Sequence, residues 1–205
     1  MSLRWWAVFL VLVGALPAPG EATTPLPDRR AVPLLVSQSG NLRKYGTGVV
    51  VGPDVILTAR HVLGQNIQIL LPQSPTPGRP ACGTRYEGLA VVKARLPRGT
   101  PRYRLSSRVP AVGQRVTVAG YPLRRWRVAT GRVTRIIHSA RLSGRVVRAT
   151  MIVFTPALDY GASGAPLLDG RGQVAGITLA SNRQANYSIA LPVATGLGAC
   201  RRFIP

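Results

Sequence analysis

Acidic residues are scarce in this chain: six Asp and Glu stand against 27 Lys and Arg, a formal net charge of +21 at pH 7 over 205 residues. Nearly all the positive residues are arginine, and many lie between Arg95 and Arg148. Such a surface attracts polyanions, with binding that weakens as salt rises. The alternative is a solvated basic surface, because the arginines alternate with Val and Thr and no nucleic-acid-binding signature is present.

Cysteine and histidine are also rare, with two of each at Cys82, Cys200, His61 and His138. They show no metal-ligand spacing, so zinc is disfavoured and we expect neither a metal nor a cofactor. The two cysteines either form one disulfide or stay as two buried thiols. His138 lies in a basic, β-rich stretch and is interpreted as a surface residue.

No apolar run is long enough to cross a bilayer, which needs about 20 residues. The longest such segment near the start, residues 7–16, follows one arginine and precedes small and helix-breaking residues. This pattern predicts a secretory signal peptide over residues 1–22, with cleavage after Ala22 or Gly20. We therefore expect a secreted or periplasmic protein without stable membrane insertion after cleavage; a permanent anchor is the weaker alternative.

Sustained helical periodicity is absent after residue 31, where short runs of Val, Ile, Leu and Thr alternate with Gly and Pro turns. The chain is therefore predicted to be all-β, with a surface loop over residues 72–80 and a crossing between two halves near residues 97–110. The predicted strands cover residues 32–37, 46–51, 55–58, 66–71, 89–94, 115–119, 131–137, 146–154, 165–168, 173–179 and 187–191.

Two motifs carry the chemistry. The stretch Asp-Tyr-Gly-Ala-Ser-Gly-Ala-Pro over residues 159–166 bends the backbone around Ser163 and exposes its hydroxyl and nearby N–H groups. A hydroxyl needs a base to accept its proton, and the oxyanion formed on an attacked carbonyl needs preorganised donors. His61, directly after an apolar β-type run, is the candidate base.

Residues 48–63 and 161–177 resemble the histidine and serine motifs of trypsin-like (chymotrypsin-fold) serine peptidases. Residues 112–122, followed by 130–133, are similar to the opening of the second barrel in bacterial peptidases of the high-temperature-requirement type. The resemblance implies an all-β fold of two six-stranded antiparallel β-barrels with the active site in the cleft between them. The expected organisation is a linker at 23–30, a first half at 31–104 and a second half at 105–205, with no PDZ-like domain.

The resemblance also implies the catalytic roles. His61 would be the base, Ser163 the nucleophile, and the N–H groups of Gly161 and Ser163 the oxyanion hole. The family places its third catalytic residue, an aspartate, where this chain has Gly88, directly after Glu87. Glu87 is the uncertain candidate for that role, since a one-residue shift in a regular strand reverses the side chain's direction.

Asp54 and Asp159 are the other acids to test, and a dyad without an acid is a further alternative. The leading hypothesis is therefore an exported serine endopeptidase acting on protein or peptide substrates. The runner-up is a catalytically impaired, protease-like peptide-binding protein.

The resemblance places the substrate pocket at Ala157, Leu179, Ala180 and Ser181, which predicts a preference for small or apolar residues at the cut position. Ala162 replaces the aspartate that digestive members use to hold a newly cut amino terminus. Activation through that ion pair is not expected.

Overall fold

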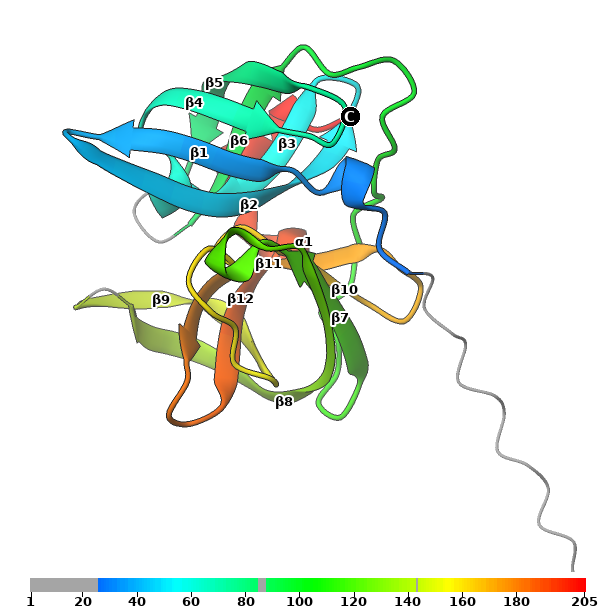
Figure 1. The fold of residues 1–205 in the computed structure, drawn as a ribbon. Helices are drawn as coiled ribbons and strands as arrows, with labels where there is room; N and C mark the ends of the chain where they lie inside the picture. The colour runs from blue at the N-terminus through cyan, green and yellow to red at the C-terminus, as the bar shows by residue number, and fades with distance from the viewer. Residues whose placement is uncertain (1–25, 85–87, 143) are drawn as a thin grey trace, which may run out of the picture.

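The structure, a computed structural model, describes residues 26–84, 88–142 and 144–205 (Figure 1). The predicted signal peptide, residues 1–22, lies outside the described residues, as does Glu87. Within the described residues, no helix combines the length and apolar character needed to cross a membrane.

Two closed antiparallel barrels form the described part of the chain, one above the other in Figure 1. The strands of the first, in the order β1-β2-β3-β6-β5-β4, are β1 (Leu34–Ser39), β2 (Leu42–Gly52), β3 (Val55–Ala59), β4 (Gln65–Leu70), β5 (Pro75–Gly83) and β6 (Leu89–Ala94). Those of the second, in the order β10-β11-β12-β9-β8-β7, are β7 (Arg115–Gly120), β8 (Arg127–Leu142), β9 (Arg145–Phe154), β10 (Pro166–Leu168), β11 (Val174–Asn182) and β12 (Tyr187–Pro192). The predicted fold class is thus confirmed.

Short helices join or end these strands. The 3-10 turns are η1 (Arg29–Ala31), η2 (Arg60–Val62), η3 (Pro122–Arg124) and η4 (Gly198–Phe203), and the single α-helical turn is α1 (Val193–Gly196). Two of these turns follow strands of different barrels: η2 comes directly after β3, and η3 comes one residue after β7.

The strands follow the apolar pattern of the sequence. All five residues of β3 are buried, as an uninterrupted apolar run predicts, whereas β4 alternates exposed and buried positions, as a strand with one wet face does. A large apolar core fills the first barrel and continues onto residues of the second half, including Met151, Ile177 and Leu191. A smaller core around Phe154 and Leu167 belongs to the second barrel.

The predicted loop over residues 72–80 is wrong, because β5 covers most of it. Proline has no N–H to donate, so it is tolerated in a strand only where the ladder does not need that donor, for example at bulges. The pairing of β5 with β6 shifts register between Pro80 and Cys82, which marks such a bulge. The high proline content of this segment is the reason that the sequence predicted a loop instead of a strand.

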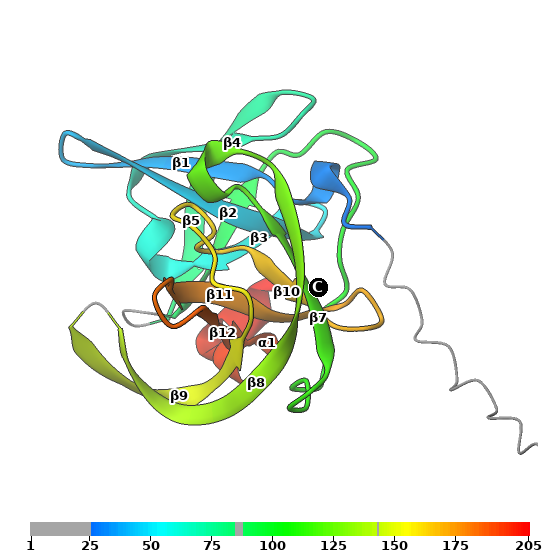
Figure 2. The same cartoon turned by 60° about the horizontal axis from the view of Figure 1, so that its bottom comes forward.

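The β8–β9 pair is longer than the sequence predicted. Both strands belong to the second barrel, the outer end of the pair projects to the left in Figure 2, and pairing continues as far as Leu142 and Arg145. The outer part of β8 is mostly polar and exposed, so it shows little apolar periodicity. Cross-strand hydrogen bonding extends this ribbon, and Ile137, Ala140 and Leu142 on it pack with the larger apolar core.

The second cysteine joins the end of the chain to the first barrel. Cys82 in β5 and Cys200 in η4 form a disulfide with an S–S distance of 2.06 Å. Between the barrels, residues 95–114 cross from β6 to β7, held by an N–H of Tyr103 donated to Val50 (2.9 Å) and by a bridge between Leu105 and Val174.

Candidate active site

His61 lies in η2, immediately after the buried strand β3. The turn is anchored at both ends: the Arg60 N–H donates to the Gly88 carbonyl (2.8 Å), and the Leu63 N–H donates to the Arg60 carbonyl (3.1 Å). Ser37 donates its hydroxyl to the Val62 carbonyl at 2.7 Å. The backbone that carries the imidazole is therefore fixed by the first barrel.

Ser163 lies on the loop between β9 and β10, in a backbone shape that two glycines make accessible. Gly161 has φ of +96° and Gly164 has φ of +88°, a region that residues with a Cβ rarely adopt. The Gly164 N–H donates to the Thr178 carbonyl (2.8 Å), and the Ala165 N–H donates to the Ala162 carbonyl (2.9 Å). The serine is thus held in a tight, hydrogen-bonded turn, with its side chain half-buried.

Thr47 in β2 joins this loop to the first barrel. Its N–H donates to the Ser163 carbonyl at 2.7 Å, and its hydroxyl donates to the Gly161 carbonyl at 2.9 Å. Its own carbonyl accepts the Thr58 hydroxyl at 2.7 Å, and the residue is fully buried. The sequence analysis missed this residue, although a polar side chain between Gly46 and Gly48 in an apolar strand was the available signal.

Gly46 shows how closely the histidine and serine segments approach. A Cβ added to Gly46 would lie 2.5 Å from both methyl groups of Val62 and 3.0 Å from the Ser163 carbonyl oxygen. Val62 follows His61 directly in η2. The turn that carries the imidazole and the loop that carries the hydroxyl therefore meet across a single glycine.

The peptide between Tyr160 and Gly161 is oriented from outside the loop. The Leu123 N–H in η3 donates to the Tyr160 carbonyl at 2.7 Å. The C=O and N–H of a trans peptide point in opposite directions, so the Gly161 N–H points away from Leu123. Among the described residues, neither this N–H nor that of Ser163 is donated to an acceptor, as an oxyanion hole requires.

A pocket of about 310 Å³ opens beside Ser163. Its lining is formed by Leu158, Asp159, Tyr160, Ala162, Ser163, Thr178, Ala180, Ser181 and Arg183. Ala180 and Ser181 were predicted to line it, whereas Leu179 and Ala157 are not among the lining residues. Leu179 instead presents its carbonyl 3.5 Å from the Ser163 hydroxyl, and the Ala157 N–H donates to Asn186 at 3.1 Å.

Hydroxyl groups brace one wall of this pocket. The Ser181 and Ser188 oxygens lie 2.9 Å apart, and the Leu158 N–H donates to both, at 3.3 and 3.1 Å. Ser188 in turn donates to the Pro156 carbonyl at 3.0 Å. Because these hydroxyls bond to one another and to backbone, they contribute neutral polar groups beside a pocket whose lining also includes Asp159 and Arg183.

Two of the candidate acids are paired elsewhere. Asp54 lies in the turn before β3, at the opposite end of that strand from His61, and accepts from Lys93 at 2.8 Å. Asp159 lines the pocket and pairs with Arg183 at 3.1 Å. The third candidate, Glu87, falls outside the described residues, so its role stays a prediction.

His138 lies far along β8 and is exposed, with its Nδ1 atom 3.3 Å from the Thr150 hydroxyl. This placement matches a surface residue. Among the residues that the structure describes, no group of three His, Cys, Asp or Glu side chains could hold a metal ion.

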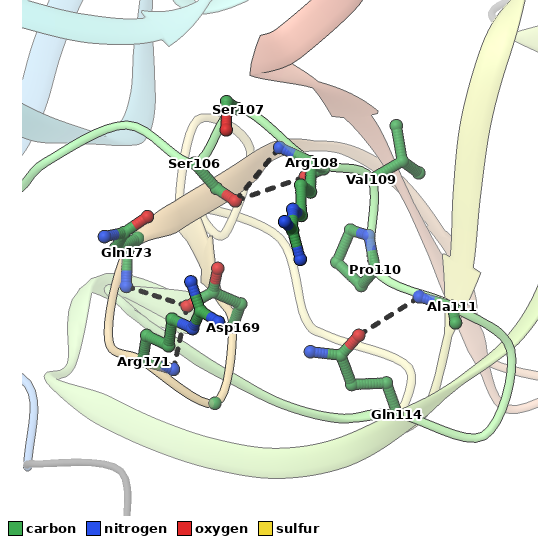
Figure 3. Close-up of a pocket in the computed structure, with 11 residues that line it drawn as sticks. Ser106, Ser107, Arg108, Val109, Pro110, Ala111, Gln114, Asp169, Arg171 and Gln173 are labelled. Atoms are coloured by element: carbon green, nitrogen blue, oxygen red, sulfur yellow. Dashed lines mark hydrogen bonds between the residues drawn. The ribbon is translucent and has the colours of Figure 1, made fainter.

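A second pocket, of about 480 Å³, lies between the inter-barrel crossing and the β10–β11 turn (Figure 3). The Asp169 carboxylate on its edge accepts the N–H groups of Arg171 (2.9 Å) and Gln173 (3.0 Å), which closes the turn. Ser106 bonds to the backbone of Arg108. These polar groups therefore stabilise loops, and no histidine or cysteine lines the pocket.

The comparisons with known proteins agree with this geometry. The model of the trypsin-like peptidase domain matches residues 46–177, which is more than half of the chain and includes His61 and Ser163. The chain therefore belongs to the trypsin-like peptidase domain family. A search of curated proteins found no match.

Solved structures share the fold at low sequence identity. The active form of the Rv3671c protease from M. tuberculosis is 22% identical, with a TM-score of 0.77 over 97% of this chain and 92% of that chain. The HtrA-type protease AlgW bound to a tripeptide is 22% identical, with a TM-score of 0.74 over 91% of this chain and 64% of that chain. A serine endoprotease from Yersinia pestis is 21% identical, with a TM-score of 0.70 over 85% of this chain and 62% of that chain. The predicted resemblance to peptidases of the high-temperature-requirement type is confirmed at the level of the fold.

Proposed function

We propose that the protein is a serine endopeptidase that cleaves peptide bonds with Ser163 as nucleophile and His61 as general base. The observation that carries the proposal is the meeting of the two catalytic segments at Gly46, where Val62 and the Ser163 carbonyl surround one glycine. The N–H groups of Gly161 and Ser163, which donate to no acceptor among the described residues, support the second requirement, a site for an oxyanion.

In the proposed reaction, the Ser163 oxygen bonds to the carbonyl carbon of the substrate while its proton passes to the His61 ring. The carbonyl oxygen becomes negative and accepts hydrogen bonds from the Gly161 and Ser163 N–H groups, each worth about 2.7 to 4 kcal/mol in the transition state. The C–N bond then breaks as His61 returns the proton to the leaving amine. Water repeats the sequence to release the acyl group from Ser163.

Glu87 is the proposed third member, which would orient the His61 ring. Gly88 itself has no side chain, and its carbonyl already accepts the Arg60 N–H at 2.8 Å. Without any orienting acid, a rate loss of about 10⁴-fold is expected. Measuring kcat for Glu87→Gln and for Asp159→Asn tests the assignment. We expect the loss of kcat in Glu87→Gln; a loss only in Asp159→Asn would show that Asp159 orients the His61 ring instead.

The pocket supports a preference for small or apolar residues at the cut position. Its volume is about 310 Å³, its walls include Leu158 and Ala180, and its one described carboxylate, Asp159, is paired with Arg183. An unpaired acid that would attract Lys or Arg is therefore lacking among the described lining residues. Protein or peptide substrates are further supported by the structures of AlgW with a tripeptide and with a decapeptide.

We also propose that the protein works after export, in the periplasm or outside the cell. The signal-peptide pattern of residues 1–22 supports this, and the Cys82–Cys200 disulfide fits an oxidising compartment. Amino-terminal sequencing of secreted protein tests it: a start after Ala22 or Gly20 is expected, and a retained residue 1 would contradict it.

Turnover of an unbiased peptide library tests the proposed activity, with cleavage products identified by mass spectrometry. We expect cleavage after small or apolar residues, abolished in both Ser163→Ala and His61→Ala. The competing function is a peptide-binding protein with impaired catalysis, favoured by Gly88 at the family's aspartate position. It would bind the peptides and release them intact.

A non-specific polyanion contact is a separate proposal about partners. Residues 127–154 contain no Asp or Glu, and six arginines on this ribbon are exposed, four of them being Arg127, Arg135, Arg141 and Arg148. Heparin chromatography tests the contact. Replacing these four by Gln should lower the eluting salt more than replacing the exposed linker residues Arg98, Arg102, Arg104 and Arg108; equal shifts would show that only net charge matters.

A further inference from the structure

The amino-terminal segment, which precedes the first barrel in sequence, makes a contact with the second barrel. Asp28 caps η1 by accepting the Arg30 N–H at 2.9 Å, and its own N–H donates to the Tyr103 hydroxyl at 2.9 Å. Ala31 and Val32 are fully buried directly afterwards. The position of Arg29 is therefore fixed on both sides.

Arg29 reaches the tyrosine that precedes η3. Its Nε donates to the Tyr121 hydroxyl at 3.2 Å, and its guanidinium carbon lies 5.8 Å from the centre of the Tyr121 ring. The ring is nearly buried and packs edge-on against Trp126, with centroids 5.5 Å apart. The ring of Tyr121 is thus held between a cation and an aromatic side chain.

The main chain of Tyr121 lies against the loop between β9 and β10 that carries Gly161 and Ser163. Its N–H donates to the Thr47 hydroxyl at 3.0 Å, and that hydroxyl donates to the Gly161 carbonyl. Its carbonyl oxygen would lie 2.5 Å from a Cβ on Gly161. A shift of Tyr121 would therefore displace the donor and the backbone that shape Gly161.

Leu123 and Arg124, which follow Tyr121, connect the position of Tyr121 to the loop that carries Gly161. Leu123 and Arg124 have positive φ values of 50° and 63°, which are uncommon without glycine and must be held by surrounding contacts. The Leu123 N–H is the donor that orients the Tyr160 carbonyl. Ala162 carries no charge, so the loop gains no support from an ion pair at that position.

We propose that Arg29 is a positioning residue for the oxyanion hole: its bond to Tyr121 holds η3 in place and so keeps the Gly161 N–H directed at the reacting carbonyl. This inference rests on the proposed peptidase function. Among the described residues, the contact of the Arg29 side chain that leads toward the Ser163 loop is the one with Tyr121, so its effect passes through that ring.

The test compares Arg29→Ala with Arg30→Ala in the full-length, exported protein. Arg30 is on the same turn but, within the described part of the chain, pairs with Asp28 and not with Tyr121, so it controls for disturbance of the segment. Because a single hydrogen bond is involved, we expect kcat and the rate of Ser163 labelling by a fluorophosphonate to fall about 3- to 10-fold in Arg29→Ala, with KM changed less than twofold. Arg30→Ala should keep both rates within twofold of the wild type.

Two further variants separate positioning from simple destabilisation. Tyr121→Phe removes only the accepting hydroxyl and should lower kcat as much as Arg29→Ala, while the double variant should fall no further. Arg29→Lys, which keeps a cationic donor, should recover part of the rate. Urea midpoints measured in parallel show whether any variant is unfolded.

Each outcome decides the proposal. Wild-type rates in a folded Arg29→Ala protein, equal losses in the Arg29 and Arg30 variants, or additive losses in the double variant would overturn the positioning role while leaving the peptidase intact. A folded wild-type protein without Ser163 labelling or turnover would overturn the peptidase itself, and the positioning role with it.

Discussion

The two barrels contribute to the site in different ways. The first supplies His61 from a turn that directly follows β3, a fully buried strand that belongs to the larger of the two apolar cores. The second supplies Ser163 from a loop outside any strand, and two glycines with positive φ shape that loop. The His61 turn is held by hydrogen bonds within the first barrel, whereas the Ser163 loop is also held by hydrogen bonds that cross to the first barrel through Thr47.

This difference indicates that the junction between the barrels, rather than either core, controls whether the site is assembled. Damage to the junction should therefore reduce activity before it unfolds a barrel. Damage within the first barrel should lower stability and activity together.

The strongest disruption of the junction is expected from Gly164→Ala. Its Cβ would meet the Thr47 carbonyl oxygen and the Thr58 hydroxyl, and the backbone has φ of +88°. Clash and strain together should cost about 5 kcal/mol of unfolding free energy, measured by urea denaturation. Gly113→Ala is the matched control, with φ of +86° and open space around the added methyl group; it should cost only about 1 kcal/mol. Equal losses would show that backbone strain alone matters.

Removing the disulfide tests the first barrel and the chain's end. The bond joins residues 118 positions apart, so the paired variant Cys82→Ser/Cys200→Ser should lose about 3 kcal/mol of stability by relaxing the unfolded state. The measurement is the urea midpoint, compared with that of the wild type under oxidising conditions, in which the Cys82–Cys200 bond is intact. An unchanged midpoint would contradict a stabilising role.

Thr47→Ala should separate activity from stability. Loss of the buried hydroxyl leaves the Gly161 carbonyl and the Tyr121 N–H without their partner, a cost of about 2 kcal/mol. Because those groups flank the oxyanion site, kcat should also fall about tenfold. Thr47→Ser keeps the hydroxyl and should retain most of the stability and most of kcat. Equal losses in the two variants would instead assign the effect to packing of the methyl group.

The smallest effect is expected at Asp28. Hydrogen bonding and ion pairing with Arg30 hold the pKa of the Asp28 carboxyl below its ordinary value. A lowered pKa contributes stability above the unfolded value of about 3.9, and this contribution is lost as pH falls through the folded pKa. Asp28→Asn should therefore lower stability by less than about 1 kcal/mol at pH 7 and by a smaller amount at pH 2. A constant difference between the two pH values would argue against the ion pair.

Much of the fold was predictable because burial follows local patterns. The uninterrupted apolar run of β3 and the predicted range of β6 agree with the structure. The strand β5 was missed because prolines lack the donor that defines a strand in sequence patterns, yet a bulge accommodates them. The outer half of β8 was missed because its exposed residues carry no apolar period.

The site was predictable only in part, for a related reason. His61, Ser163 and Gly161 stand in short motifs, whereas Thr47, Tyr121 and Leu123 act through contacts between segments far apart in the chain. Thr47 is 114 residues from Gly161, and Tyr121 is 92 from Arg29. Sequence order contains no direct signal for such pairs. The pocket shows the same limit, since spacing from Ser163 favoured Ala157 where the structure has Leu158.

Covalent labelling by a fluorophosphonate, mapped by mass spectrometry, tests the central claim most directly. If the barrels assemble a working nucleophile and base, folded wild-type protein carries the adduct on Ser163, Ser163→Ala carries none, and His61→Ala reacts at least about 10³-fold more slowly. A folded wild-type protein that stays unlabelled, or one labelled equally fast without His61, would contradict the account.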